Sequence, residues 1–185
     1  YDRKWKKKIL PKKNFYEKKL QKIDVIDALK KIISHPNICN KQWVWEQYDH
    51  TVMADTIQKP GGDAGVIRIH KTLKAVAMSV DSSAEYCAAH PLTGAKQVIC
   101  ENWRNLISVG AKPLAITNCL NFGNPEKEKT MGEFVESING MSEACKYLDY
   151  PVVSGNVSFY NETNNKNIKP TPIIGGVGLI DDIEK

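Results

Sequence analysis

The sequence has little that is typical of a membrane protein or of a secreted, disulfide-stapled domain. Hydrophobic residues make up 42% of the 185, but no run of them is long enough to cross a bilayer. The five cysteines are odd in number, and no two are separated by only two residues, which argues against zinc knuckles and disulfide frameworks. We therefore expect a soluble, cytoplasmic protein with free thiols and no membrane partner.

Common catalytic motifs are also missing. The sequence has no Gly-x-x-x-x-Gly-Lys-Ser/Thr loop, no Gly-x-Gly-x-x-Gly turn and no nucleophile elbow. Its four histidines lack the spacing of a metal site. The glycine-rich stretch 175–178 lies inside an apolar run, so we interpret these glycines as allowing strands to pack closely.

The excess positive charge is confined to the N-terminus. Residues 1–22 hold ten of the 26 Lys and Arg residues but only two of the 21 Asp and Glu residues. This stretch is predicted to be a basic arm or linker, distinct from a domain spanning 23–185. The arm could tether nucleic acid, but few aromatics interrupt it and no base-reading motif follows, so a solvated linker is the simpler interpretation.

Hydrophobic periodicity predicts an α/β (α+β) domain with a sheet covered by helices on at least one face. Asp24 can cap a first helix, and Gly110 stands where a helix commonly ends in a left-handed residue. The aromatic segment 41–48 either packs on the domain or stacks on a base. The expected helices are 24–34, 93–109 and 130–148, and the expected strands are 65–70, 73–80, 113–117, 151–154 and 172–180.

Three loops rich in small polar residues are expected to follow strands, at residues 81–85, 118–126 and 154–162. Ligands of open α/β sheets bind off strand ends, and glycines there allow backbone amides to approach a phosphate. Amide oxygens also suit Mg²⁺. Taken singly, however, each loop is more readily explained as a structural turn.

Together the loops resemble a known family. Leu120-Asn-Phe-Gly-Asn-Pro-Glu126 and Pro151-Val-Val-Ser-Gly-Asn-Val-Ser-Phe-Tyr-Asn-Glu162 are similar to stretches of the large subunit of phosphoribosylformylglycinamidine synthase. Shorter stretches fit the same pattern in the same order, and the resemblance extends from about Asp24 onward. They are 43–49, 60–63, 104–105 and 109–111.

The resemblance implies an AIR synthetase N-terminal-like domain from the second half of a two-halved ligase. In that family such sheets pair into a barrel-like dimer with a sister domain or a second copy. The enzyme is an ATP-dependent amidotransferase of de novo purine synthesis, which converts formylglycinamide ribonucleotide to formylglycinamidine ribonucleotide with Mg²⁺. Its partners are a glutaminase subunit and a small accessory subunit. The family's catalytic histidine belongs to its first half, so we expect this chain alone to be inactive.

The resemblance also assigns candidate site residues. Gly155 and Asn118 match nucleotide-binding positions, Asn156 a Mg²⁺ ligand and Ser158 a substrate contact. Many members have an aspartate in place of Asn118. If the strands before residues 118 and 156 are neighbours, both asparagines should lie at one rim of the sheet, and a bulky residue at 155 should block a ligand without harming the fold.

The chain departs from the family at two further positions, where Glu85 replaces an arginine and His90 an acidic residue. Two alternatives to the ligase domain stay open at this point. One is a non-catalytic scaffold or regulatory nucleotide-binding domain, and the other is a nucleic-acid-binding module that uses the basic arm.

Overall fold

A computed structural model describes residues 3–8 and 23–185. The chain divides into two compact units, one formed by Tyr1–Lys8 and His50–Lys185, the other by Ile9–Asp49. Most of the predicted basic arm lies outside the described residues. Across residues 3–8 and 23–185, none of the helices combines the length and apolarity that a membrane span requires.

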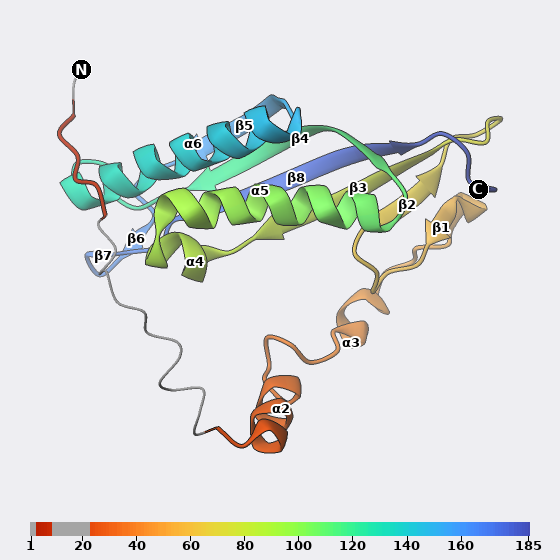
Figure 1. Cartoon of the computed structure of the whole chain (residues 1–185), viewed down its shortest axis with the longest axis horizontal. Helices are drawn as coiled ribbons and strands as arrows, with labels where there is room; N and C mark the ends of the chain where they lie inside the picture. The colour runs from red at the N-terminus through yellow and green to blue at the C-terminus, as the bar shows by residue number, and fades with distance from the viewer. Residues whose placement is uncertain (1–2, 9–22) are drawn as a thin grey trace. The chain divides into compact units, whose positions relative to one another are not determined.

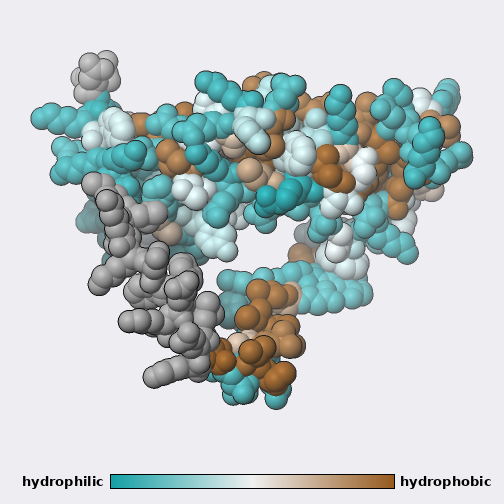
Figure 2. Space-filling model, viewed as in Figure 1, coloured by the Kyte–Doolittle hydropathy of each residue, from teal (hydrophilic) through white to brown (hydrophobic). Residues whose placement is uncertain are grey.

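The smaller unit contains helices α2, Val25–Ile33, and α3, Gln42–Trp45. The predicted capping is confirmed, because the Asp24 side chain accepts a hydrogen bond from the Asp27 amide at 2.9 Å. All the large apolar side chains of α2 are exposed, and Figure 2 shows them gathered along it. Trp43 is exposed as well, so neither interpretation of the aromatic segment is settled.

The larger unit is built on a six-stranded sheet with the order β1-β2-β3-β8-β4-β5. Neighbouring strands are antiparallel except β4 and β5, which are parallel. A separate hairpin, β6–β7, follows β5 in the chain. The strands are β1 Thr56–Gln58, β2 Gly65–Arg68, β3 Ala75–Ser82, β4 Lys112–Asn121, β5 Val152–Ser158, β6 Glu162–Thr163, β7 Lys166–Asn167 and β8 Thr171–Ile180, and a short 3₁₀ turn, Val52–Ala54, precedes β1.

Helices α4, Ala84–Ala89, α5, Pro91–Ser108, and α6, Glu128–Leu148, cover one face of this sheet (Figure 1). Capping residues define the termini of the two long helices. His90 caps α5 by accepting a hydrogen bond from the Thr93 amide, and Gly110 follows that helix with φ of 80°, as predicted. Asp149 ends α6 in the left-handed conformation.

Alternation along the strands separates the two faces of the sheet. In β3, Ala75 and Ala77 are buried under the helices, whereas Met78 and Val80 point to the opposite face and are exposed. At one end of the core, Phe122 meets Phe134 edge to face with ring centroids 5.3 Å apart. The face opposite the helices, called the open face below, therefore exposes apolar side chains along β3 and β8, where Met78, Val80 and Val177 lie.

The predicted fold class, a mixed sheet covered by helices, is confirmed, and the sheet of the described residues is open. The hairpin formed by the strands at 65–70 and 73–80 and all three helices are also confirmed. The predicted strands 113–117 and 151–154 are too short, because β4 reaches Asn121 and β5 reaches Ser158. Their asparagines and serines favour turns, but a strand with one solvent-exposed face tolerates them. The sequence pattern did not predict α3, β1, α4 or the β6–β7 hairpin.

Close packing of α5 against α6 yields a first prediction. A Cβ added to Gly140 would overlap the Leu92 carbonyl oxygen and lie 2.9 Å from its carbon. Gly140→Ala should therefore destabilise the protein by about 1–3 kcal/mol through overpacking, although alanine ordinarily favours a helix.

Ser142→Ala, at an exposed position of the same helix, is the matched control and should change stability little. Denaturant unfolding of both variants measures the difference. A Gly140→Ala variant at least as stable as the Ser142→Ala variant would contradict this packing.

Candidate functional site

The four candidate residues lie within strands β4 and β5, and not in loops after them. The parallel register pairs Asn118 with Gly155, Cys119 with Asn156, and Asn121 with Ser158. The expectation that the two strands are neighbours is therefore confirmed. The predicted position off the strand ends is wrong for Asn118, Gly155 and Asn156, because β4 continues to Asn121 and β5 to Ser158.

The register also separates the candidate side chains by face. Asn118 alternates with the buried Ile116 and Leu120, so it lies on the helix-covered side of the sheet. Asn156 pairs with Cys119 and therefore lies on the open face. The two asparagines thus share a level of the sheet and both line one depression along β5, but their side chains point to opposite faces, which the predicted rim did not include.

Gly155 is in tight contact with Asn118. A Cβ at Gly155 would overlap the Asn118 side-chain oxygen and lie 2.5 Å from the Asn118 backbone oxygen. Only glycine fits there without a shift of the strands, since real Cβ contacts of this kind essentially never fall below 3.0 Å. The glycine thus brings the Asn118 amide against the backbone of β5.

A shallow depression of about 470 Å³ lies along β5 at this point. Asn118, Leu120 and Gly155 belong to it, and Phe134 of α6 closes one side. In the described part of the chain, β5 is the last strand on its side of the sheet, so the depression is open along a free strand edge. An apolar wall beside one amide group suits a flat, partly polar ligand.

On the open face, β4 and β5 carry a row of uncharged side-chain oxygen atoms. The Ser154 hydroxyl donates to the Thr117 hydroxyl at 2.8 Å, and Asn156 lies two residues further along β5. Within residues 3–8 and 23–185, no three His, Cys, Asp or Glu side chains are grouped so that they could hold a metal ion. Of these groups, the Asn156 amide oxygen suits a Mg²⁺ that keeps waters and ligand phosphates in its shell.

Ser158 ends β5 and is held by Asn161. The Asn161 amide donates to the Ser158 hydroxyl at 3.1 Å, to the Ser158 carbonyl at 3.0 Å and to the Phe122 carbonyl at 3.0 Å. The Phe122 amide in turn donates to the Ser158 carbonyl at 2.9 Å. The C-terminal end of β5 is therefore fixed to the chain that leaves β4.

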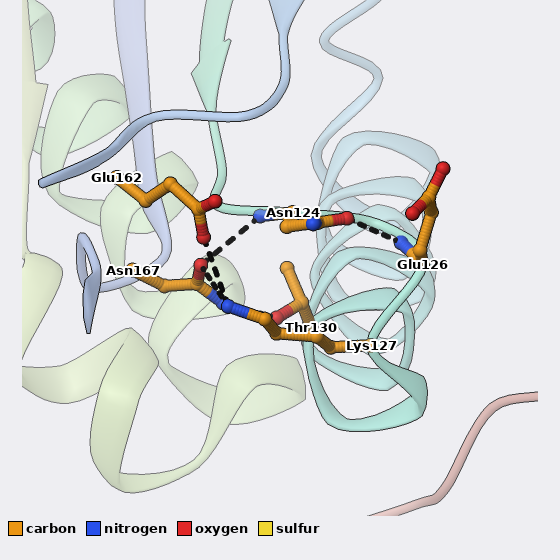
Figure 3. Close-up of polar contacts among 6 residues, drawn as sticks. All are labelled: Asn124, Glu126, Lys127, Thr130, Glu162 and Asn167. Atoms are coloured by element: carbon orange, nitrogen blue, oxygen red, sulfur yellow. Dashed lines mark hydrogen bonds and ion pairs between the residues drawn. The ribbon is translucent and has the colours of Figure 1, made fainter. Parts of the chain in front are cut away.

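The β6–β7 hairpin reinforces this connection through the polar contacts drawn in Figure 3. Asn167 accepts a hydrogen bond from the Asn124 amide at 3.2 Å and donates to the Thr130 hydroxyl at 2.7 Å. Lys127 forms an ion pair with Glu162 at 2.9 Å. These contacts join the hairpin to the loop between β4 and α6.

A buried polar network, which sequence reasoning missed, lies at the other end of β5. The Tyr150 hydroxyl donates to the Asn102 side-chain oxygen at 2.8 Å, and the Asn102 amide donates to Asp81 at 2.8 Å. Burial, with smaller contributions from Cys145 and Asp81, raises the pKa of the Tyr150 hydroxyl, so it remains a donor. Asn102 falls on the buried face of the predicted helix 93–109, and a polar residue there was the available signal.

Fold and comparison together define the class of protein. Residues 61–180 match the family described as "AIR synthase related protein, N-terminal domain". The chain therefore belongs to the family of AIR synthase-related N-terminal domains, as its mixed sheet with two long covering helices also indicates.

Among individual proteins, the chain is 68% identical over 185 residues to the phosphoribosylformylglycinamidine synthase subunit PurL of Pelagibacter ubique, covering 100% of this chain and 25% of that protein. The structure of PurLQS from Thermotoga maritima is similar with a TM-score of 0.73 and 36% identity over 77% of this chain and 24% of that chain. T. maritima PurL has also been solved with ATP, with a TM-score of 0.69, 35% identity and coverage of 77% and 24%.

The same T. maritima protein has been solved with FGAR, at a TM-score of 0.69, 36% identity and coverage of 77% of this chain and 23% of that one. This chain thus spans about a quarter of the length of these relatives. The relative from P. ubique is a phosphoribosylformylglycinamidine synthase subunit, so the resemblance first seen in the sequence is confirmed.

The fit of Gly155 against Asn118 yields the second prediction. Gly155→Val should lower the free energy of unfolding by about 1–3 kcal/mol, because the added side chain must displace β5 from β4. This corrects the expectation that a bulky residue at 155 leaves the fold intact. Chemical denaturation measures the loss.

Ser154→Val places the same side chain one residue earlier, at an exposed position on the open face. It should change the unfolding free energy by less than about 1 kcal/mol. Equal losses in the two variants would show that the Gly155 contact is unimportant.

Proposed function

We propose that the chain is the nucleotide- and Mg²⁺-binding domain of a phosphoribosylformylglycinamidine synthase, from the second half of that enzyme. The parent protein uses ATP to convert formylglycinamide ribonucleotide to the amidine in the cytoplasm. The observation that carries the proposal is the β4–β5 register, which sets Asn118 directly against Gly155 beside an open depression. The ATP and FGAR complexes of T. maritima PurL support it.

The nucleotide lies along the free edge of β5 in this proposal. Its base and ribose occupy the depression walled by Leu120 and Phe134, where Asn118 supplies a hydrogen-bonding amide. Asn118 carries no charge where many family members have an aspartate, so hydrogen bonding rather than charge attraction defines its role. Because β5 is an edge strand, the phosphates can pass around it to the open face.

Asn156 and Ser158 meet those phosphates on the open face. The Asn156 side-chain oxygen is the protein ligand of Mg²⁺, and the remaining ligands are phosphate oxygens and waters. The Ser158 hydroxyl donates a hydrogen bond to the anionic part of the ribonucleotide substrate. Such sites act by positioning charged groups and neutralising them, not by covalent chemistry.

The open face also provides the surface for a sister domain or a second copy of this one. Met78, Val80 and Val177 are exposed on it from two adjacent strands. An apolar patch on the uncovered face of a sheet is the kind of surface that a partner sheet covers. The glutaminase and small accessory subunits are further proposed partners of the parent protein, in keeping with the T. maritima PurLQS assembly.

Magnesium-dependent nucleotide binding is the third prediction. The isolated chain should bind ATP weakly in the presence of Mg²⁺ and more weakly without it. Asn156→Ala should raise the Kd for Mg²⁺–ATP about tenfold, because a ligand to a charged group is lost. Isothermal titration calorimetry measures both effects.

Asn139→Ala, an exposed asparagine on α6, is the matched control and should leave the Kd unchanged. If ATP binds equally well to the Asn156→Ala variant and to wild type, the metal role of Asn156 is wrong. If wild type binds no nucleotide at millimolar concentration, the proposed site is wrong as a whole.

Self-association through the open face is the fourth prediction. The chain should form a two-fold dimer, and Val80→Lys should shift it toward monomer, because a charge would be buried against apolar surface. Val80 is 72% exposed, so the variant should fold normally.

Tyr147→Lys makes a comparable change on α6, where Tyr147 is 89% exposed, and should leave the dimer intact. Analytical ultracentrifugation over a range of concentrations distinguishes the variants. A wild-type chain that stays monomeric at high concentration would count against pairing through this face.

A further inference from the structure

Strand β5 carries three of the four candidate residues, yet burial does not hold it in place. Six of its seven residues are exposed, and the seventh, Ser158, is half-buried. The register of a strand is strongly specified only where one of its faces is buried, and a slip by one residue turns every side chain to the other face. Something other than burial must therefore hold β5 in register.

The register of β5 also contains an irregularity. Ile116 pairs with Val152, but the next residue, Thr117, pairs with Ser154, so Val153 is an extra residue in the strand. The extra residue is what brings Gly155 opposite Asn118. Without it, a residue with a Cβ would face Asn118, where there is no room for one.

Tyr150 lies two residues before Val152 and is the nearest buried residue on the chain that leads into β5. Its side chain is only 1% exposed, and its backbone amide donates to the Cys145 carbonyl at 2.9 Å. The following residue, Pro151, accepts the first hydrogen bond between the strands, from the Ile116 amide at 2.9 Å. Tyr150 thus directly precedes the residue at which β5 begins to pair with β4.

The partner of the Tyr150 hydroxyl is itself fixed. The Asn102 amide group donates to the Asp81 carboxylate at 2.8 Å and to the Ser79 carbonyl at 3.1 Å, which leaves its oxygen directed toward Tyr150. Asp81 is held in turn by the Asn105 amide at 2.8 Å. Gly176 makes room for this arrangement, since a Cβ there would overlap the Asn102 oxygen and the Tyr150 hydroxyl.

We propose that Tyr150, hydrogen-bonded through Asn102 to Asp81, is a positioning residue that sets the register of β5 and hence the geometry of the nucleotide site. This inference rests on the proposed function. Tyr150 touches no ligand; it acts by holding the strand that carries Gly155, Asn156 and Ser158. The network links this edge strand to β3 and α5, which form the rigid core of the domain.

Tyr150→Phe tests the proposal, because it removes one hydroxyl and keeps the ring in the core. The matched control is Tyr147→Phe, the same change three residues earlier at an exposed position of α6. Hydrogen–deuterium exchange of individual amides is measured in both variants. In Tyr150→Phe, the amides of β5 should exchange about tenfold faster than in wild type, as expected for an unsatisfied buried acceptor, while those of β3 and β8 stay protected.

The two possible roles of Tyr150 give different results. If the hydroxyl only stabilises the whole domain, exchange in β3 and β8 should increase as much as in β5, and the positioning role is wrong. Unchanged exchange in β5 would also overturn it. The Kd for Mg²⁺–ATP should rise severalfold in Tyr150→Phe and not in Tyr147→Phe.

The exchange result separates this inference from the proposed function. If wild type binds ATP and Tyr150→Phe binds it equally well, the positioning role fails and the nucleotide site stands. If wild type binds no ATP, the proposed function fails, and the exchange pattern still decides whether Tyr150 holds β5 in register.

Discussion

The contact between Gly155 and Asn118 is the constraint on which the candidate site depends. It admits no Cβ on β5 at that level, so it accepts one register of the strand and excludes its neighbours. Hydrogen bonds at both ends of the strand support the same register, through Tyr150 before it and Asn161 after it. A strand that buries almost nothing is thereby held in one register, while its outer edge is unpaired in the described residues.

The two faces of the sheet have different surroundings and different roles in the proposed function. Helices α5 and α6 cover one face and supply the core, which leaves the opposite face free to meet another sheet. The open face is apolar along β3 and β8, and it is polar along β4 and β5, where Thr117, Ser154 and Asn156 lie. Partner binding and ligand binding can therefore use adjoining parts of one surface.

The sequence predicted the fold class and the main elements because their signals are local. The apolar stripe of the helix at 130–148 and the alternation of the hairpin at 65–80 can be read within one window of residues. The lengths of β4 and β5 were underestimated, because Asn118 and Ser154 favour turns when they are considered alone. What makes them strand residues is pairing between segments more than thirty residues apart, which local patterns do not contain.

The site shows the same limit. The resemblance supplied all four candidate residues, and the adjacency of their strands followed correctly. The resemblance did not predict that the Asn118 and Asn156 side chains lie on opposite faces. Their placement depends on the extra residue at Val153 and on the register that results. The network of Asp81, Asn102 and Tyr150 joins three segments that are distant in the sequence, so no local sequence motif predicts it.

The most direct test of this account is a map of backbone amide shifts by nuclear magnetic resonance as Mg²⁺ and a non-hydrolysable ATP analogue are added to the chain. The largest shifts should fall on Asn118, Gly155 and Asn156, at the level where β4 and β5 pair. Shifts concentrated instead around the lysine-rich hollow lined by Lys127, Lys129 and Lys169, with β5 unaffected, would contradict it.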